Sequence, residues 1–365
     1  ELGLRMHPEH PYDSPNVNVI IDDARAYLER TERRYDLIVF GILDSQTLLS
    51  GMSNVRLDNF VYTVESMREA QEHLNPGGVL ALTFDVERWW IKQRLAETLL
   101  EVFGYPPVQL SMKGSPQIIY ISGYQASADE IEALCVERAC TVEAPLGFAS
   151  VPLATDDWPY LYLERRSIPL PYWVVLLVVL AIAWVSTRKA FSTTRRLDWH
   201  FFFLGGAFLL IEFKSITQLA LLFGSTWIVN AVAVSAVLLM VLLANLVVSR
   251  ARRLNVTVLY VLLLFSLFLG FVMPLRWMLA RGGVMRMVVP SLVMGLPLFF
   301  ASAIFSSSLK RAQDVTAAFG SNFLGSAVGG MLEYGTLVSG ISSLYLFGAI
   351  LYVLAWLTRQ HARRT

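Results

Sequence analysis

The stretch Asp156–Ser186 (DDWPYLYLERRSIPLPYWVVLLVVLAIAWVS) decides the fold, because the chain changes character at about Ile168. Upstream of this point the sequence is mixed and charged, as in a globular domain. Downstream, from Leu170 to Leu357, one apolar run follows another. Over all 365 residues 55% are hydrophobic, which is more than an ordinary soluble protein contains. We therefore expect a soluble domain over residues 1–165 and a membrane region over residues 166–365.

The membrane region contains seven apolar runs, of which the first and the last are short. A helix needs roughly 20 apolar residues to cross the hydrocarbon core of a bilayer. The sequence thus predicts an all-α polytopic bundle of about seven transmembrane helices in a lipid bilayer. The runs are Leu170–Ser186, Phe201–Phe223, Trp227–Val248, Val256–Leu275, Val284–Phe305, Val315–Val338 and Leu344–Leu357.

Basic residues divide unevenly between the two sides of such a bundle. If the loops alternate, one side carries twelve Lys and Arg residues and the other carries three. Cytoplasmic loops are the ones enriched in Lys and Arg. We therefore expect a multi-pass protein of the inner (cytoplasmic) membrane with a cytoplasmic C-terminal tail and, given seven spans, an extracytoplasmic soluble domain. If the first run does not cross, the soluble domain is cytoplasmic instead. The twelve are Arg188, Lys189, Arg195, Arg196, Arg250, Arg252, Arg253, Lys310, Arg311, Arg359, Arg363 and Arg364, and the three are Arg276, Arg281 and Arg286.

Polar residues lie inside the predicted spans, namely Glu212, Lys214, Gln218, Asn322 and Glu333, with Asn230 and Asn245 in the third run. Ionisable groups at membrane depth are costly unless they are paired or hydrated, so we expect them to face the bundle interior. They are compatible with a substrate or proton path, or with polar contacts between helices. Lys214 could be neutralised by Glu212 or by Glu333.

A Gly-x-x-x-Gly pair, Gly325 and Gly329, lies in the sixth run. This spacing is typical of membrane helices that approach each other closely. We expect tight packing of this helix against a neighbour.

The soluble part alternates strand and helix patterns. Such alternation favours an α/β Rossmann-like domain with a parallel, doubly wound sheet. Ligands of these sheets bind at the carboxyl ends of the strands, where Asp22-Asp23-Ala24, the Gly41–Thr47 loop and Asp85 are expected. The expected strands are Val17–Ile21, Asp36–Phe40, Val79–Phe84 and Ile118–Gly123, and the expected helices are Asp22–Arg34, Phe60–His73 and Ile91–Phe103.

Three consecutive blocks carry a family resemblance: Val19–Arg25 (VIIDDAR), Tyr35–Phe40 (YDLIVF) and Leu74–Leu80 (LNPGGVL). They resemble the spermidine synthases, which are aminopropyltransferases with a class I methyltransferase-type fold. Thr155–Tyr160 (TDDWPY), followed by apolar runs, is similar to membrane-fused spermidine-synthase-like proteins of bacteria. The resemblance extends over nearly the whole chain.

The resemblance implies a nucleoside site at Asp22, Asp23 and Ala24, in which Asp23 would hold the adenine amino group. Asp22 or Asp23 could instead cap the helix that begins there. The family has a general-base aspartate where this chain has Gly41, and glycine cannot accept a proton. Asp44 could substitute for it or simply form a turn.

The resemblance also implies a glycine-rich turn and an acidic residue that would precede Glu1, so we expect the domain to lack its first βαβ segment. The first functional hypothesis is then a degenerate transferase, or pseudoenzyme, that acts as a scaffold or accessory subunit beside other membrane proteins. The first alternative is an active polyamine aminopropyltransferase, completed by upstream residues and using decarboxylated S-adenosylmethionine. The second is a transporter or sensor of a polyamine-like cation. In the degenerate protein the function would lie at the junction around Asp156–Arg166.

Other classes of ligand have little support in the sequence. The net charge is +1 and no basic stripe with aromatic residues occurs, so we expect no nucleic-acid partner. The histidines and cysteines lack the spacing of metal ligands, and we expect neither a metal nor a required cofactor. Cys135 and Cys140 are either a disulfide of an oxidising compartment or two free thiols.

Overall fold

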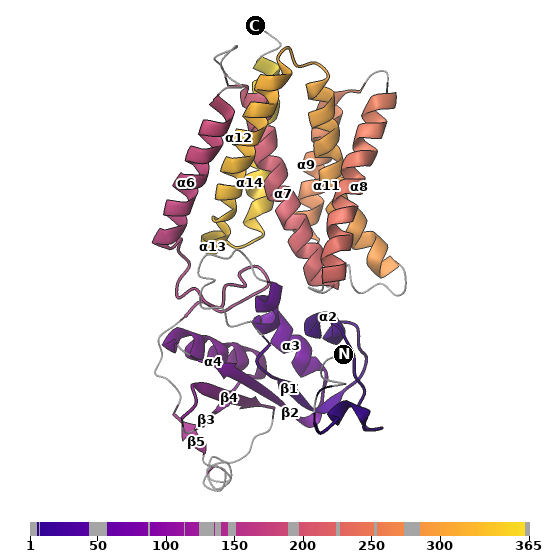
Figure 1. Cartoon of the computed structure of the whole chain (residues 1–365). Coiled ribbons are helices and arrows are strands. Elements are labelled where there is room, and N and C mark those ends of the chain that lie inside the picture. The colour runs from indigo at the N-terminus through magenta and orange to yellow at the C-terminus, as the bar shows by residue number, and fades with distance from the viewer. Residues whose placement is uncertain are drawn as a thin grey trace.

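The computed structural model describes residues 6, 8–43, 57–86, 88–112, 114–123, 135, 140–144, 151–188, 197–223, 227–251, 254–273 and 285–361. An α/β domain and a helical bundle lie end to end (Figure 1). The N-terminus belongs to the α/β domain, and the C-terminus lies at the end of the bundle that is remote from this domain.

The sheet of the α/β domain has the strand order β1-β2-β4-β3-β5. Only β1 and β2 are parallel, whereas β2–β4, β3–β4 and β3–β5 are antiparallel. The prediction of a parallel, doubly wound sheet is therefore wrong for the described strands beyond the first pair, and the sheet is mixed. A short turn with Gly114 at φ +80° joins β3 to β4, and so short a connection allows only antiparallel pairing. The strands are β1 (Tyr35–Phe40), β2 (Leu74–Asp85), β3 (Val108–Met112), β4 (Gln117–Ser122) and β5 (Cys140–Glu143).

Three of the four predicted strands are confirmed as β1, β2 and β4. The fourth, Val17–Ile21, forms no strand. Its side chains have no sheet neighbour to pack against, and Ile21 is 92% exposed. The β-rich pattern of these residues is therefore present without the pairing that would turn it into a strand.

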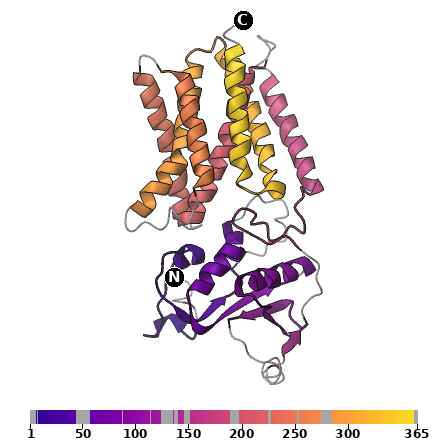
Figure 2. The ribbon, with the colours of Figure 1, turned by 180° about the vertical axis from the view of Figure 1, so that it is seen from behind.

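Helices cover the sheet face that is turned toward the bundle (Figures 1 and 2). Alternate β2 residues Leu80, Leu82 and Phe84 are fully buried against this layer, as expected for side chains on one face of a strand. The predicted helix over 60–73 is divided at Thr63, whose hydroxyl caps the second part, and that over 22–34 is reduced to five residues. The elements are η1 (Pro11–Asp13), α2 (Ala24–Leu28), η3 (Leu57–Tyr62), α3 (Val64–Glu72) and α4 (Trp89–Phe103).

The described part of the C-terminal region is mostly helical. Among the described residues, three helices are long and apolar enough to cross a membrane: Leu170–Thr187, Trp199–Leu219 and Val289–Leu309. Two apolar helices, Val234–Arg250 and Val256–Val272, are shorter. The elements are α6 (Leu170–Thr187), α7 (Trp199–Phe223), α8 (Trp227–Arg250), α9 (Val256–Val272), α11 (Met285–Leu309), α12 (Val315–Glu333), α13 (Thr336–Ser339) and α14 (Ser343–His361).

The Gly-x-x-x-Gly pair brings α12 against α7. A Cβ atom at Gly325 would collide with the backbone carbonyl of Phe202, and one at Gly329 with the backbone of Gly206. Two helix backbones therefore meet where the glycines leave room, as predicted from the motif.

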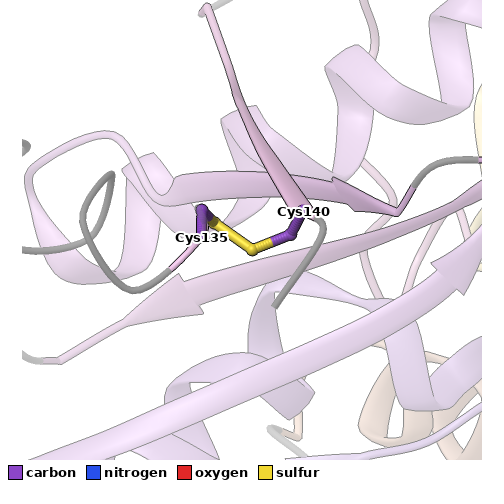
Figure 3. Close-up of a disulfide and its surroundings, with 2 residues drawn as sticks. All are labelled: Cys135 and Cys140. Carbon is purple, nitrogen blue, oxygen red and sulfur yellow. A yellow bond between two sulfur atoms is a disulfide. The ribbon is translucent and has the colours of Figure 1, made fainter. Parts of the chain in front are cut away.

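Cys135 and Cys140 form a disulfide, with their Cα atoms 4.7 Å apart. Figure 3 shows the bridge beside the strands of the sheet. Of the two interpretations of the cysteines, the structure contains the bonded one.

Candidate functional site

An open groove of about 500 Å³ runs along the free edge of β1. Asp22 and Ala24, two of the three residues expected in a nucleoside site, line it, together with Tyr27 and Leu43. The hydroxyl groups of Tyr27 and Tyr35 lie 2.7 Å apart on one side of this groove. The groove thus combines a carboxylate and hydroxyl groups with the apolar side chains of β1.

Asp23 caps the N-terminus of α2. Its carboxylate accepts a hydrogen bond of 3.0 Å from the backbone N–H of Ala26, which is the capping role that the sequence allowed. Asp22 accepts a bond from the N–H of Asp23 and forms an ion pair with Arg30. Both carboxylates therefore have structural partners.

The carboxyl ends of β1 and β2 carry little acid–base chemistry in the described residues. A Cβ atom at Gly41 would meet no described atom within 4 Å. Asp44 lies outside the described residues. Asp85, the last residue of β2, has one buried carboxylate oxygen without a described hydrogen-bond partner. Among the described residues, the carboxyl ends of these two strands thus carry one carboxylate, at the end of β2, and none at the end of β1.

A second constellation joins the α/β domain to the bundle and is formed by residues 154–166, here named the interdomain strap. Arg25, at the start of α2, donates to both carboxylate oxygens of Asp156 at 2.5 and 2.6 Å. It also donates to the carbonyl of Phe60 and the hydroxyl of Thr63. Burial alone would favour a neutral guanidine, but Asp156 outweighs it and raises the pKa of Arg25 above its ordinary value. Helix α2 therefore contributes residues both to the groove and to the contact with the strap.

The next strap residues contact the α13–α14 turn of the bundle. The backbone carbonyl of Asp157 accepts from the N–H of Ile341, and its carboxylate accepts from the N–H of Ser342, both at 2.7 Å. Gly340 has φ +86° there, and a Cβ atom would collide with the Asp157 side chain. Only glycine combines this conformation with such a close approach.

Aromatic strap residues extend the contact. The indole N–H of Trp158, which is fully buried, donates to the Leu337 carbonyl at 2.8 Å. The hydroxyl groups of Tyr160 and Thr336 lie 2.5 Å apart. These contacts bury aromatic side chains and also satisfy their polar atoms.

Arg94 holds the strap from the side of the α/β domain. Its guanidinium is fully buried and donates to five carbonyl groups: that of Pro152, just before the strap, and those of four strap residues between Tyr160 and Glu164. It also lies 5.3 Å from the ring centroid of Trp158. Burial lowers the pKa of Arg94 to about 10. One side chain from α4 therefore organises much of the strap backbone.

The predicted polar residues of the bundle take separate positions. Asn322 donates to the Phe201 carbonyl on α7 at 3.3 Å, which is a contact between helices. Lys214 forms no ion pair with Glu212 or Glu333 in the described structure; its ammonium group instead lies 5.3 Å from the ring centroid of Tyr345. The expected neutralisation of Lys214 by one of these glutamates is therefore not found among the described residues, where the ammonium group lies over an aromatic ring.

Sequence reasoning missed Arg25 and Arg94 as organising residues. Arg25 stands directly after the Asp-Asp-Ala motif, and Arg94 lies among the buried residues of an amphipathic helix next to Leu95. An arginine on an apolar helix face is a usable signal, because a buried guanidinium must find acceptors. The acceptors of Arg94 are backbone carbonyl groups. A sequence pattern does not show which carbonyl groups these will be.

No protein-family model matches the chain.

Proposed function

We propose that the chain is an integral membrane protein whose α/β domain is a degenerate, spermidine-synthase-like module. It acts as a scaffold or accessory subunit beside other membrane proteins. The observation that carries this proposal is the interdomain strap, because an enzyme that is merely anchored to a membrane needs no such bonding to its anchor. Gly41 stands where the resembled family has its general-base aspartate, and this supports loss of catalysis.

The proposed topology has seven membrane-crossing helices, an extracytoplasmic α/β domain and a cytoplasmic C-terminus. The disulfide between Cys135 and Cys140 supports an oxidising compartment for this domain, because disulfides are rare in the cytosol. The exposed apolar surfaces of the helices support lipid contact: Phe265, Phe268 and Phe271 of α9 are 61%, 61% and 58% exposed.

The loss of catalysis is tested with purified full-length protein, decarboxylated S-adenosylmethionine and putrescine. We expect no spermidine above a blank without protein. Turnover that is abolished by Asp44→Asn or Asp85→Asn would overturn the proposal. Gly41→Asp is the informative gain-of-function variant, since a Cβ atom at this position would meet no described atom within 4 Å.

The topology is tested by thiol labelling of intact cells after mild reduction. We expect an impermeant maleimide to label Cys135 and Cys140 without permeabilisation of the inner membrane. The Cys135→Ser, Cys140→Ser double variant is the control for background. Labelling that requires permeabilisation would place the domain in the cytoplasm.

An active aminopropyltransferase, completed by residues upstream of Glu1, is the second candidate. The groove beside Asp22 and Ala24 favours it, because a pocket of about 500 Å³ is within the size range of ligand sites. In that case the turnover assay is positive and an Asp22→Ala variant loses nucleoside binding.

A further inference from the structure

Four helices of the bundle meet around Tyr345 of α14, whose ring faces Lys214 of α7. Tyr345 lies beneath the Lys214 ammonium group, and the same tyrosine contacts Met294 of α11 and Gly270 of α9. Lys214 is only 5% exposed. It therefore sits in the interior of the bundle and does not reach out to an aqueous surface.

Two hydrogen-bond donors beside Tyr345, the Lys214 ammonium group and the Gln218 amide, have no matching acceptors among the described residues. The Tyr345 hydroxyl donates to Gln218 Oε1 at 2.6 Å, which occupies the amide oxygen and leaves the Gln218 amide N–H₂. Lys214 and Gln218 are one helical turn apart on the same face of α7. Within the described ranges neither Lys214 Nζ nor Gln218 Nε2 has an acceptor.

Nearby carboxylates do not fill this role. Asp157 of the interdomain strap binds the Ser342 N–H, and the Tyr345 N–H donates to the Ser342 carbonyl, so Lys214 at the Tyr345 ring lies toward the side of the α/β domain. However, Asp156 is held by Arg25 and Asp157 by the Ser342 N–H. Neither forms an ion pair with Lys214.

An ammonium group at membrane depth is unfavourable unless its donors are satisfied. Contact with the Tyr345 ring compensates for part of this cost, but it leaves the N–H groups on the other side of the nitrogen. These groups and the Gln218 amide need oxygen acceptors, and an anionic oxygen also matches the charge.

We propose that Lys214, Gln218 and Tyr345 form an intramembrane binding site for a carboxylate or phosphate group that enters from the side of the α/β domain. Lys214 supplies the charge, Gln218 supplies an amide donor, and Tyr345 fixes both through its ring and its hydroxyl. This site is independent of the proposed loss of catalysis in the α/β domain.

The test uses the full-length protein in phosphatidylcholine nanodiscs and measures thermal unfolding. Sodium succinate and sodium phosphate are each compared with sodium chloride at equal ionic strength. We expect at least one of them to raise Tm by about 2 °C or more, because a ligand that binds only the folded state stabilises it. A parallel arm adds phosphatidylglycerol, and a rise in that arm alone identifies a lipid phosphate as the source of the anion.

Variants test whether Lys214 is responsible for the rise in Tm on addition of anions. Lys214→Met should abolish the rise, and Lys214→Arg should retain part of it. Gln218→Glu places a carboxylate beside Lys214 and should abolish the response to added anions while keeping the fold, so it serves if Lys214→Met does not fold. Lys310→Met is the matched control, because Lys310 donates to the Val248 carbonyl elsewhere in the bundle. The absence of a rise in every arm, or a rise that persists in Lys214→Met or in Gln218→Glu, would overturn the proposal.

Discussion

Arg25 and Asp156 form a two-bond ion pair across 131 residues of sequence. The pair joins the helix beside the groove to the strap residue that precedes Asp157. Asp157 in turn binds the turn before α14, which carries Tyr345. The groove, the strap and the bundle interior are therefore connected by hydrogen bonds and the short chain segments between them.

Breaking this pair should destabilise the protein strongly. Arg25→Met leaves Asp156 beside Glu29 and Glu65, and removal of one partner of a buried pair costs about 3–5 kcal/mol. We expect a clear fall in Tm. The control is Arg30→Met, which removes the more exposed pair with Asp22 and should cost less than about 1 kcal/mol. Equal effects of the two substitutions would contradict a special role for Arg25.

Stability should depend on the protonation of Glu29. Burial raises the pKa of Glu29 from 4.5 to about 7, although Arg25 partly opposes this shift. The folded state therefore binds a proton between pH 4.5 and pH 7 that the unfolded state releases, so stability falls as the pH rises through this window. The Glu29→Gln variant should lose about 1–3 kcal/mol less of its free energy of unfolding than the wild type as the pH rises through this window. Denaturant unfolding at pH 5 and pH 8 measures it, and an unchanged pH profile would refute the assignment.

Arg94 should control the order of the strap. Arg94→Met leaves five carbonyl groups without their donor and should cost about 3 kcal/mol or more. Arg94→Lys should recover only part of this, because an ammonium group lacks the planar set of donors. Limited proteolysis with trypsin, which cleaves at Arg165 and Arg166, provides the readout. Cleavage in the strap should be faster in both variants, and an unchanged rate would show that other contacts suffice.

The sequence predicted local elements better than their assembly. β1, β2, β4 and α4 follow from apolar runs and turn residues that lie within each segment. The sequence analysis missed the antiparallel strands β3 and β5. Both are short, and they are strands because of the segments they pair with, since their own residue patterns are too weak to predict a strand.

The same distinction applies to the candidate site. Asp22, Asp23 and Ala24 were found because a contiguous motif contains them, and the capping by Asp23 was foreseen as one alternative. The strap was expected only as a junction of interest, without its contacts. Arg25, Asp156 and Gly340 come together from three distant segments, and pairing of that kind depends on tertiary structure that no local pattern encodes.

The glycines of α12 allow a comparison between neighbouring positions. Gly329→Ala places a methyl group against the backbone of Gly206, which cannot yield without separation of α12 from α7. Gly330→Ala meets only the flexible end of Leu209, 3.3 Å away. We expect Gly329→Ala to lower Tm by several degrees and Gly330→Ala to leave it nearly unchanged, since alanine is also the better helix former. Thermal unfolding of both variants in the same detergent measures the difference. If the two variants unfold at the same temperature, the close approach of α7 and α12 does not stabilise the bundle.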